Sequence, residues 1–137
     1  MQNIEIKKRT EGGLRTKGVF KKSQTGKPLI TVITAVYNGE KYLEECIQSL
    51  HQQNYDNIEH IIVDGGSNDK TLEIIRKYEN KIDYWISEKD KGIYDAFNKG
   101  MKFPTGDYLG FLNSDDVYTS KAFDYLLKYI KKNPETD

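Results

Sequence analysis

The 137-residue sequence predicts an α/β fold, a three-layer α/β/α sandwich built around a mostly parallel sheet. Short apolar runs of strand length alternate four times with amphipathic helical patterns. The connections between them are short, which predicts parallel strands joined by right-handed helical crossovers. The length is that of one ordinary domain and is too small for two independent cores.

The first strand is predicted at residues 29–36, where Leu-Ile-Thr-Val-Ile-Thr-Ala-Val is mostly apolar, as in a strand buried on both faces. Asn38 and Gly39 end this run, and an amphipathic helix follows that ends near Asn54. Its core-facing residues recur at i, i+4 and i+7, and are Leu43, Ile47 and Leu50.

The other three units follow the same pattern. Their strands are predicted at residues 58–63, 82–87 and 108–112. Their helices are predicted from about residue 69, over 93–101, and over 120–132. Pro104 and Gly106 end the third helix before the last strand begins.

Basic residues are concentrated at the N-terminus. Residues 1–28 hold eight Lys or Arg and two Glu, a net charge of +6, which leaves −6 for the remainder because the whole sequence is neutral. Such segments are usually solvated tails, so we expect a poorly ordered or extended arm at 1–28 and the domain at 29–137. Contact between the arm and a membrane surface is kept as a hypothesis, and no nucleic-acid partner is expected.

The sequence also bears on location. Its longest apolar runs are well short of the about 20 residues that cross a bilayer, and the polar start lacks the layout of a signal peptide. The single cysteine, Cys46, cannot form an internal disulfide. We expect a cytoplasmic protein, located at the inner face of the membrane if the arm binds lipid.

Polar segments follow each predicted strand. They are Tyr-Asn at 37–38, Asp-Gly-Gly-Ser-Asn-Asp at 64–69, Glu-Lys-Asp-Lys-Gly at 88–92 and Asn-Ser-Asp-Asp at 113–116. Each one alone is typical of a turn or helix cap. Together they line one edge of the sheet, because parallel strands deliver their carboxyl ends to the same side, where ligands bind.

This edge is predicted to be acidic. Bringing the carboxylates of Asp64, Asp90, Asp115 and Asp116 into one crevice is costly unless a cation lies among them. Oxygen ligands without His or Cys select Mg²⁺ or Mn²⁺, which usually bind one or two carboxylates together with substrate phosphates. The implied ligand is a diphosphate compound.

The glycines refine this prediction. No Walker A or GxGxxG pattern follows the first strand, so the phosphates are not held as in a P-loop or a dinucleotide fold. Gly65 and Gly66 follow the second strand instead, where bare backbone lets a base approach and Asp64 can accept a hydrogen bond from a base N–H.

Four segments, in order and spacing, resemble glycosyltransferase family 2, in the GT-A version of the fold. They are Thr-Val-Ile-Thr-Ala-Val-Tyr-Asn-Gly-Glu at 31–40, Ile-Ile-Val-Asp-Gly-Gly-Ser-Asn-Asp at 61–69, Ser-Glu-Lys-Asp-Lys-Gly-Ile-Tyr-Asp-Ala-Phe-Asn-Lys-Gly at 87–100 and Gly-Phe-Leu-Asn-Ser-Asp-Asp at 110–116. The resemblance covers residues 28–118, most of the chain.

The resemblance implies a site for a nucleoside-diphosphate sugar. Asp64 would read the base, and residues 113–115 stand where the family has its DXD motif, with Asp115 and Asp116 as the expected metal ligands. The other expected contacts are Val36, Tyr37, Asn38, Glu40, Gly65, Gly66, Lys91, Gly92, Asp95, Asn113 and Ser114.

The sequence departs from the family at two places. Asn113 replaces the usual Asp, and an amide can bind a ribose hydroxyl but is a weaker metal ligand. Tyr-Asp-Ala at 94–96 replaces the usual Arg-Asn, so Lys91 or Lys99 is a candidate for contacting the diphosphate.

The activity that the resemblance implies is inverting, metal-dependent transfer of the sugar to a hydroxyl of a glycan or lipid-linked acceptor, in surface polysaccharide synthesis. The base that activates the acceptor is expected beyond residue 137, so we interpret the chain as an incomplete GT-A domain without its acceptor-side half. Apolar surface left by missing elements would favour a homo-oligomer.

Two alternatives remain open. The chain is a nucleotide-binding or partner-binding module without catalysis, or it is a nucleotidyltransferase that makes sugar nucleotides. The second alternative is disfavoured because the glycine-rich loop expected after the first strand is missing.

Overall fold

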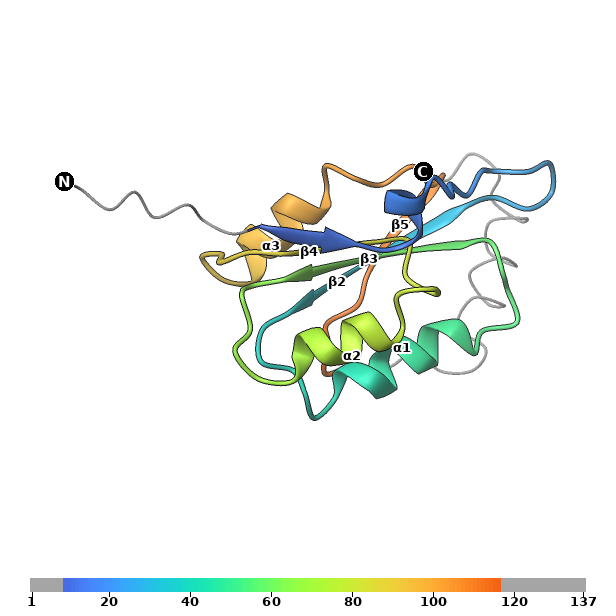
Figure 1. Ribbon diagram of the computed structural model, residues 1–137. Coiled ribbons are helices and arrows are strands. Elements are labelled where there is room, and N and C mark those ends of the chain that lie inside the picture. The colour runs from blue at the N-terminus through green and yellow to red at the C-terminus, as the bar shows by residue number, and fades with distance from the viewer. Residues whose placement is uncertain (1–8, 117–137) are drawn as a thin grey trace.

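The computed structural model describes residues 9–116, and the helix predicted at 120–132 lies outside them. A five-stranded sheet has the order β1-β4-β3-β2-β5. Its strands are β1 (Thr10–Gly12), β2 (Ile30–Val36), β3 (Ile58–Asp64), β4 (Tyr84–Ser87) and β5 (Tyr108–Phe111). The helices are η1 (Leu14–Lys17, 3₁₀), α1 (Leu43–His51), α2 (Thr71–Lys77) and α3 (Ile93–Gly100). Helices α1 and α2 cover one face of the sheet and α3 covers the other (Figure 1), which confirms the predicted three layers.

The sheet is mostly parallel, as predicted. Strand β2 pairs in parallel with β3 and β5, and β3 pairs in parallel with β4, whereas β1 is antiparallel to β4. Strands β2 and β3 are buried along their whole length. Val36 is in register with Asp64, which is in register with Ser87, so three strands deliver their carboxyl ends to one edge.

Alternate residues of each central strand pack on opposite faces. Toward α1 and α2 the buried core includes Val36, Leu43, Ile47, Ile62 and Ile75. Toward α3 it includes Ile33, Ala35, Ile61, Val63 and Ala96. The two cores hold both helical layers against the sheet and fix where α1 and α3 begin.

A glycine brings α3 close to the sheet. A Cβ added at Gly100 would lie 2.6 Å from Ile33 Cγ2 and 3.2 Å from Val63 Cγ2. We therefore expect Gly100→Ala to lower the free energy of unfolding by about 1–3 kcal/mol, since overpacking displaces neighbours in a dense core. Urea denaturation measures the change, with Asn98→Ala on the exposed side of α3 as the control. Equal midpoints for the two variants would contradict this close packing.

The N-terminal segment differs from the prediction. Of the expected poorly ordered or extended arm, residues 9–28 belong to the fold: β1 extends the sheet, and η1 begins with Leu14 N and Arg15 N donating to the carbonyls of Ile82 and Asp83 at 3.0 and 2.9 Å. The sequence pattern missed this because the backbone partners of β1 and η1 lie more than 60 residues away.

Basic side chains of this segment neutralise acidic groups of the sheet. Arg15 forms an ion pair with Glu59, and Lys21 Nζ lies 3.1 Å from Asp83 Oδ2. Glu59 and Asp83 are each 1% exposed. These two cations are therefore internal partners of the fold rather than charges held out toward a lipid surface. Within residues 9–116 there is no helix of the length and apolar character that crossing a membrane requires.

Candidate functional site

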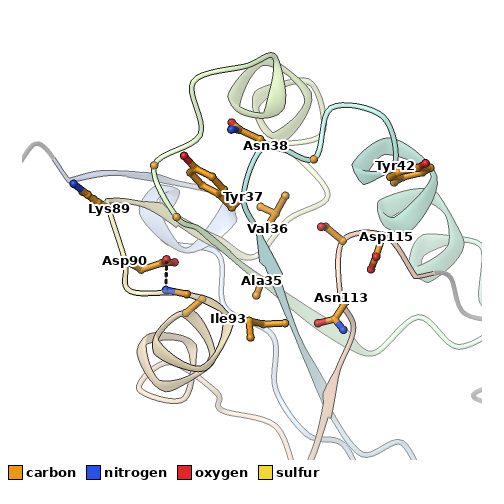
Figure 2. A pocket seen from close by; sticks show the side chains of 16 residues that line it. Ala35, Val36, Tyr37, Asn38, Tyr42, Lys89, Asp90, Ile93, Asn113 and Asp115 are labelled. Atoms are coloured by element: carbon orange, nitrogen blue, oxygen red, sulfur yellow. Dashed lines mark hydrogen bonds between the residues drawn. The ribbon is translucent and has the colours of Figure 1, made fainter.

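A pocket of about 730 Å³ lies at the carboxyl edge of the sheet. Its volume is in the range of small-molecule sites. It is lined by Ala35, Val36, Tyr37, Asn38, Gly39, Tyr42, Gly65, Gly66, Lys89, Asp90, Gly92, Ile93, Ala96, Asn113, Ser114 and Asp115. Figure 2 shows the end of β2 running into the pocket between side chains that come from the β4–α3 connection and from the turn after β5.

The end of β2 supplies the floor and one wall. Val36 is buried, whereas the Tyr37 side chain that follows is 61% exposed. Asn38 has a φ of 49° and joins two loops, because its N–H donates to Ser67 Oγ at 2.7 Å and its Oδ1 accepts from Asn68 N at 3.0 Å. Glu40 does not line the pocket; its Oε2 accepts from Lys70 N at 3.2 Å.

The end of β3 contains a buried carboxylate. Asp64 is 0% exposed, and its Oδ2 accepts hydrogen bonds from Gly66 N at 3.2 Å, Ser67 N at 3.0 Å and Ser87 Oγ at 2.6 Å. Its Oδ1 accepts from Ser67 Oγ. Asp64 thus fixes the loop and does not line the pocket, whereas Gly65 and Gly66 do.

The connection from β4 to α3 supplies Lys89, Asp90, Gly92 and Ile93 to the pocket. Asp90 Oδ1 accepts from Gly92 N at 3.0 Å, and the φ of 118° at Gly92 is one that side-chain-bearing residues rarely adopt. This turn orients Asp90 at the start of α3.

Two residues that were predicted to contact the nucleotide sugar, Lys91 and Asp95, lie outside the pocket lining. Asp95 Oδ2 accepts from Lys91 N at 2.9 Å, and neither residue lines the pocket. Lys99, the alternative phosphate contact, lies 3.3 Å from Glu88 Oε1 and donates to Lys89 O at 3.1 Å. Lys89 is instead the lysine among the lining residues.

The turn after β5 closes the opposite wall. Asp116 N donates to Asn113 O at 3.0 Å, and Ser114 N donates to Ala35 O at 3.3 Å, which ties the turn to β2. Asn113 Oδ1 is buried and has no hydrogen-bond partner among the described residues. Asp115 is exposed and lines the pocket, whereas Asp116 does not line it.

The acidic side chains are more dispersed than the sequence suggested. Of the carboxylates expected to meet, Asp90 and Asp115 line the pocket from opposite sides (Figure 2), Asp64 is buried in its loop and Asp116 lies outside the lining. In residues 9–116 no three His, Cys, Asp or Glu side chains are grouped so as to hold a metal ion. The expectation that all four carboxylates meet in one crevice is therefore wrong. Asp64 is held in its own loop by hydrogen bonds, and the loop geometry separates the other three.

A hard cation still fits the turn after β5. Asp115 and the unpartnered Oδ1 of Asn113 offer oxygen ligands, without His or Cys in the pocket lining. A cation held there needs most of its ligands from phosphates or water, which is the usual situation for Mg²⁺.

Several lining residues are not among the predicted contacts. They are Ala35, Gly39, Tyr42, Lys89, Asp90, Ile93 and Ala96. Tyr42 and Ile93 flank the starts of α1 and α3 and are 54% and 45% exposed. Their position at a strand-to-helix connection is the signal that the sequence offers for them. The sequence places Asp90 at the acidic edge but assigns it no contact.

The sequence is similar to a known protein family and to individual glycosyltransferases. The family model described as Glycosyl transferase family 2 matches residues 31–137. An uncharacterized glycosyltransferase of Rickettsia typhi is 38% identical over 116 residues, which are 85% of this chain and 36% of that protein. The uncharacterized glycosyltransferase EpsJ of Bacillus subtilis is 35% identical over 108 residues, 77% of this chain and 31% of that protein.

Solved structures agree with these matches. Residues 1–349 of S. aureus TarS, in complex with UDP-GlcNAc, superpose with a TM-score of 0.68 at 29% identity, covering 76% of this chain and 31% of that chain. The mannosyltransferase PcManGT of Pyrobaculum calidifontis, in complex with GDP-Man and Mn²⁺, has a TM-score of 0.68 at 24% identity, covering 82% and 34%, and this likeness shows the fold.

The chain spans about a third of the length of these proteins. The predicted GT-A fold is confirmed by the solved structures. The family model covers more than half of the chain, and the sheet edge carries the segments on which the resemblance was based. The chain belongs to glycosyl transferase family 2.

Proposed function

We propose that this chain provides the donor site of a glycosyltransferase and binds a nucleoside-diphosphate sugar in the pocket at the carboxyl edge of the sheet. The observation that supports this most directly is that four loops, from β2, β3, β4 and β5, converge on one pocket of about 730 Å³. TarS, whose structure contains UDP-GlcNAc, has the same fold at 29% identity.

The two walls of the pocket suit the two ends of such a donor. Tyr37 offers an exposed ring next to the bare backbone of Gly65 and Gly66, where a flat base can lie. On the opposite wall Asn113 and Asp115 offer oxygen atoms to a diphosphate-bound cation. We place Mg²⁺ or Mn²⁺ at Asp115 with support from Asn113.

A divalent cation bound at this turn would neutralise the charge that develops on the departing diphosphate. The residues of this chain position the donor: the buried Asp64 holds the loop that carries Gly65 and Gly66, and the Ser114 bond to Ala35 holds the turn that carries Asp115. Transfer is an inverting displacement at the anomeric carbon by an acceptor hydroxyl, which needs a base to remove its proton.

The acceptor that we propose is a glycan or lipid-linked hydroxyl in surface polysaccharide synthesis on the cytoplasmic side of the membrane. Because the chain spans about a third of its relatives, we propose that the acceptor base lies outside it. A donor-binding module without catalysis is the second candidate, favoured by the lack of an assigned base in the pocket lining.

Binding of UDP or GDP is expected to stabilise the chain against heat more strongly in the presence of Mn²⁺. Asp115→Ala should weaken this metal-dependent binding by roughly ten-fold, and stabilisation at saturating ligand then falls by about 1.4 kcal/mol. Thermal shift with each nucleotide, with and without Mn²⁺, measures the effect. Glu45→Ala, an exposed carboxylate on α1 away from the lining, is the matched control. An equal Mn²⁺ effect in Asp115→Ala and the wild type would refute the metal assignment.

A further inference from the structure

We propose that residues 17–22, the docking loop, bind the surface of an anionic lipid bilayer. Val19 and Phe20 insert between the lipids, and Lys17 and Lys22 contact the phosphate headgroups. The inference goes beyond the proposed function, because the docking loop contributes no residue to the donor pocket. It assigns to four residues the membrane contact that the sequence suggested for the whole of residues 1–28.

Val19 and Phe20 are an apolar pair that the fold leaves in solvent. They are 48% and 59% exposed, although valine and phenylalanine are residue types that folded proteins usually bury. An aromatic side chain offers about 150–250 Å², so the pair offers much less than the about 800 Å² that each partner contributes to a stable protein interface. Membrane-surface segments combine a few apolar residues with lysines, and both contribute to binding. The small size of the pair therefore favours a lipid surface over a second copy of the chain.

Hydrogen bonds fix the backbone on both sides of this pair. Val19 N donates to Leu14 O at 3.1 Å, which closes the turn after η1. Beyond Phe20, the carbonyl of Lys22 accepts from Asn57 Nδ2 at 3.0 Å. Ordering a mobile segment costs free energy on binding, and a loop that is already held in place avoids most of that cost.

The charge of the docking loop is complementary to anionic lipids. Residues 12–39 contain no Asp or Glu. Three of the five cations in this stretch are paired with carboxylates elsewhere in the fold, and they are Arg15, Lys21 and Lys27. Lys17 and Lys22 are exposed and form no ion pair within residues 9–116. Asp107 Oδ2 accepts from Leu29 N near the end of the stretch, and the two free lysines outweigh its charge.

The docking loop and the donor pocket lie at opposite ends of the sheet. Asn57, which holds the loop, directly precedes β3, whereas Gly65 of the pocket directly follows it. The seven residues of β3 separate the two by roughly 20 Å. Figure 1 shows the blue segment that leads into β2 at the end of the sheet away from the start of α3. Insertion of the loop into a bilayer therefore leaves the pocket uncovered.

The direct test is Phe20→Trp in the full chain, mixed with vesicles of equal parts of phosphatidylcholine and phosphatidylglycerol. The single natural tryptophan, Trp85, is 2% exposed and gives a constant background. We expect the emission from position 20 to shift to shorter wavelength and to be quenched by lipids that are brominated in their acyl chains. An emission spectrum that these vesicles leave unchanged would overturn the proposal.

Co-sedimentation with the same vesicles measures the affinity. Val19→Ser combined with Phe20→Ser should weaken binding by roughly ten-fold, because the apolar area that enters the bilayer is lost. Lys17→Gln combined with Lys22→Gln should weaken binding to the anionic vesicles by up to about five-fold for each lysine. The lysine effect should shrink at high salt and should be missing with vesicles of phosphatidylcholine alone.

Tyr94→Ser combined with Lys70→Gln is the matched control. Both residues are exposed, Tyr94 by 83%, and both lie outside the docking loop and the pocket lining. This control should bind the anionic vesicles as the wild type does. Thermal unfolding without lipid checks that each variant keeps its fold.

Three outcomes would overturn the proposal. The first is a wild type that does not bind the anionic vesicles. The second is a serine variant of Val19 and Phe20 that binds them as tightly as the wild type, or a control that loses as much affinity as this variant. The third comes from sedimentation velocity without lipid: a dimeric wild type and a monomeric serine variant would identify the pair as a contact between copies of the chain.

Discussion

Replacing Arg15 with methionine is expected to lower the free energy of unfolding by about 3–5 kcal/mol, because it leaves a buried carboxylate without its cation. Glu59 is 1% exposed in the centre of the sheet, and Arg15, 12% exposed, is its ion-pair partner. Burial by itself would raise the pKa of Glu59, but Arg15 and the hydrogen bonds from Thr105 and Thr31 hold that pKa below its ordinary value. The carboxylate is therefore charged at neutral pH and depends on this partner.

Urea denaturation of the full chain at pH 7 measures the loss. Lys17→Met is the control, since Lys17 is exposed and its Nζ donates to the neutral Asn80 Oδ1 at 3.3 Å, and it should change stability by less than about 0.5 kcal/mol. Glu59→Gln added to Arg15→Met should recover part of the loss, because the amide oxygen can still accept from Thr105 while the charge is gone. A loss below about 1 kcal/mol in Arg15→Met would contradict a structural role for this segment.

This prediction also bears on the hypothesis of membrane contact. A truncation of residues 1–28 removes both Arg15 and Lys21, and so leaves Glu59 and Asp83 unpaired in the interior. Loss of vesicle binding in such a truncation would therefore reflect unfolding as much as the loss of lipid contact. Charge-neutral substitutions at Lys7 and Lys8 are the better test, since they keep both internal ion pairs.

The layers of the fold could be predicted because they depend on local patterns. The runs that form β2 and β3 are buried along their whole length, and continuous apolar character indicates this directly. The ends of elements were less predictable. The third predicted strand began at residue 82, but β4 begins at Tyr84, since the carbonyls of Ile82 and Asp83 accept from η1 instead of from a neighbouring strand.

The candidate site was also predictable only in part. Its position followed from the topology, because the carboxyl ends of parallel strands share an edge. Which carboxylate faces the pocket did not follow, since Asp64 accepts a hydrogen bond from Ser87, 23 residues away, and Asp90 is oriented by the hydrogen bond that it accepts from Gly92 N. Residue type and spacing cannot distinguish an aspartate that fixes a loop from one that faces a ligand.

Acidification from pH 7 to pH 4 is expected to destabilise the chain by about 3 kcal/mol through His51 alone. Burial, followed by the charges of Lys21 and Lys81, lowers the pKa of His51 to about 4. Burial, followed by His51 and Lys21, lowers the pKa of the neighbouring His60 well below its ordinary value. The two ring centroids are 5.7 Å apart, and His60 Nε2 lies 2.8 Å from Thr34 Oγ1. His60 is fully buried and His51 is partly buried, and their lowered pKa values keep both rings neutral at pH 7.

The sign follows from proton uptake. The folded pKa of His51 is below the value of about 6.5 that it has in the unfolded chain, so the unfolded state binds the proton first as pH falls. Stability is full above about pH 6.5 and declines by up to about 1.4 kcal/mol per pH unit for each histidine. The decline in stability that is due to His51 ends near pH 4. The decline that is due to His60 continues to lower pH values, because its pKa in the folded chain is lowered well below the ordinary value. Carboxylates with a lowered pKa, such as Glu59, add to the loss only below about pH 4.5.

Urea midpoints measured between pH 7.5 and pH 4.5 test this expectation. In the wild type both histidines contribute to the slope near pH 5, whereas His51→Leu leaves only His60, so the slope in the variant should be about half as steep. Lys81→Met is the comparison variant: it removes a charge that lowers the pKa of His51, so it should soften the decline without abolishing it. Stability that stays constant between pH 7 and pH 5, or a slope that His51→Leu does not change, would show that the fold does not lower the pKa of these histidines.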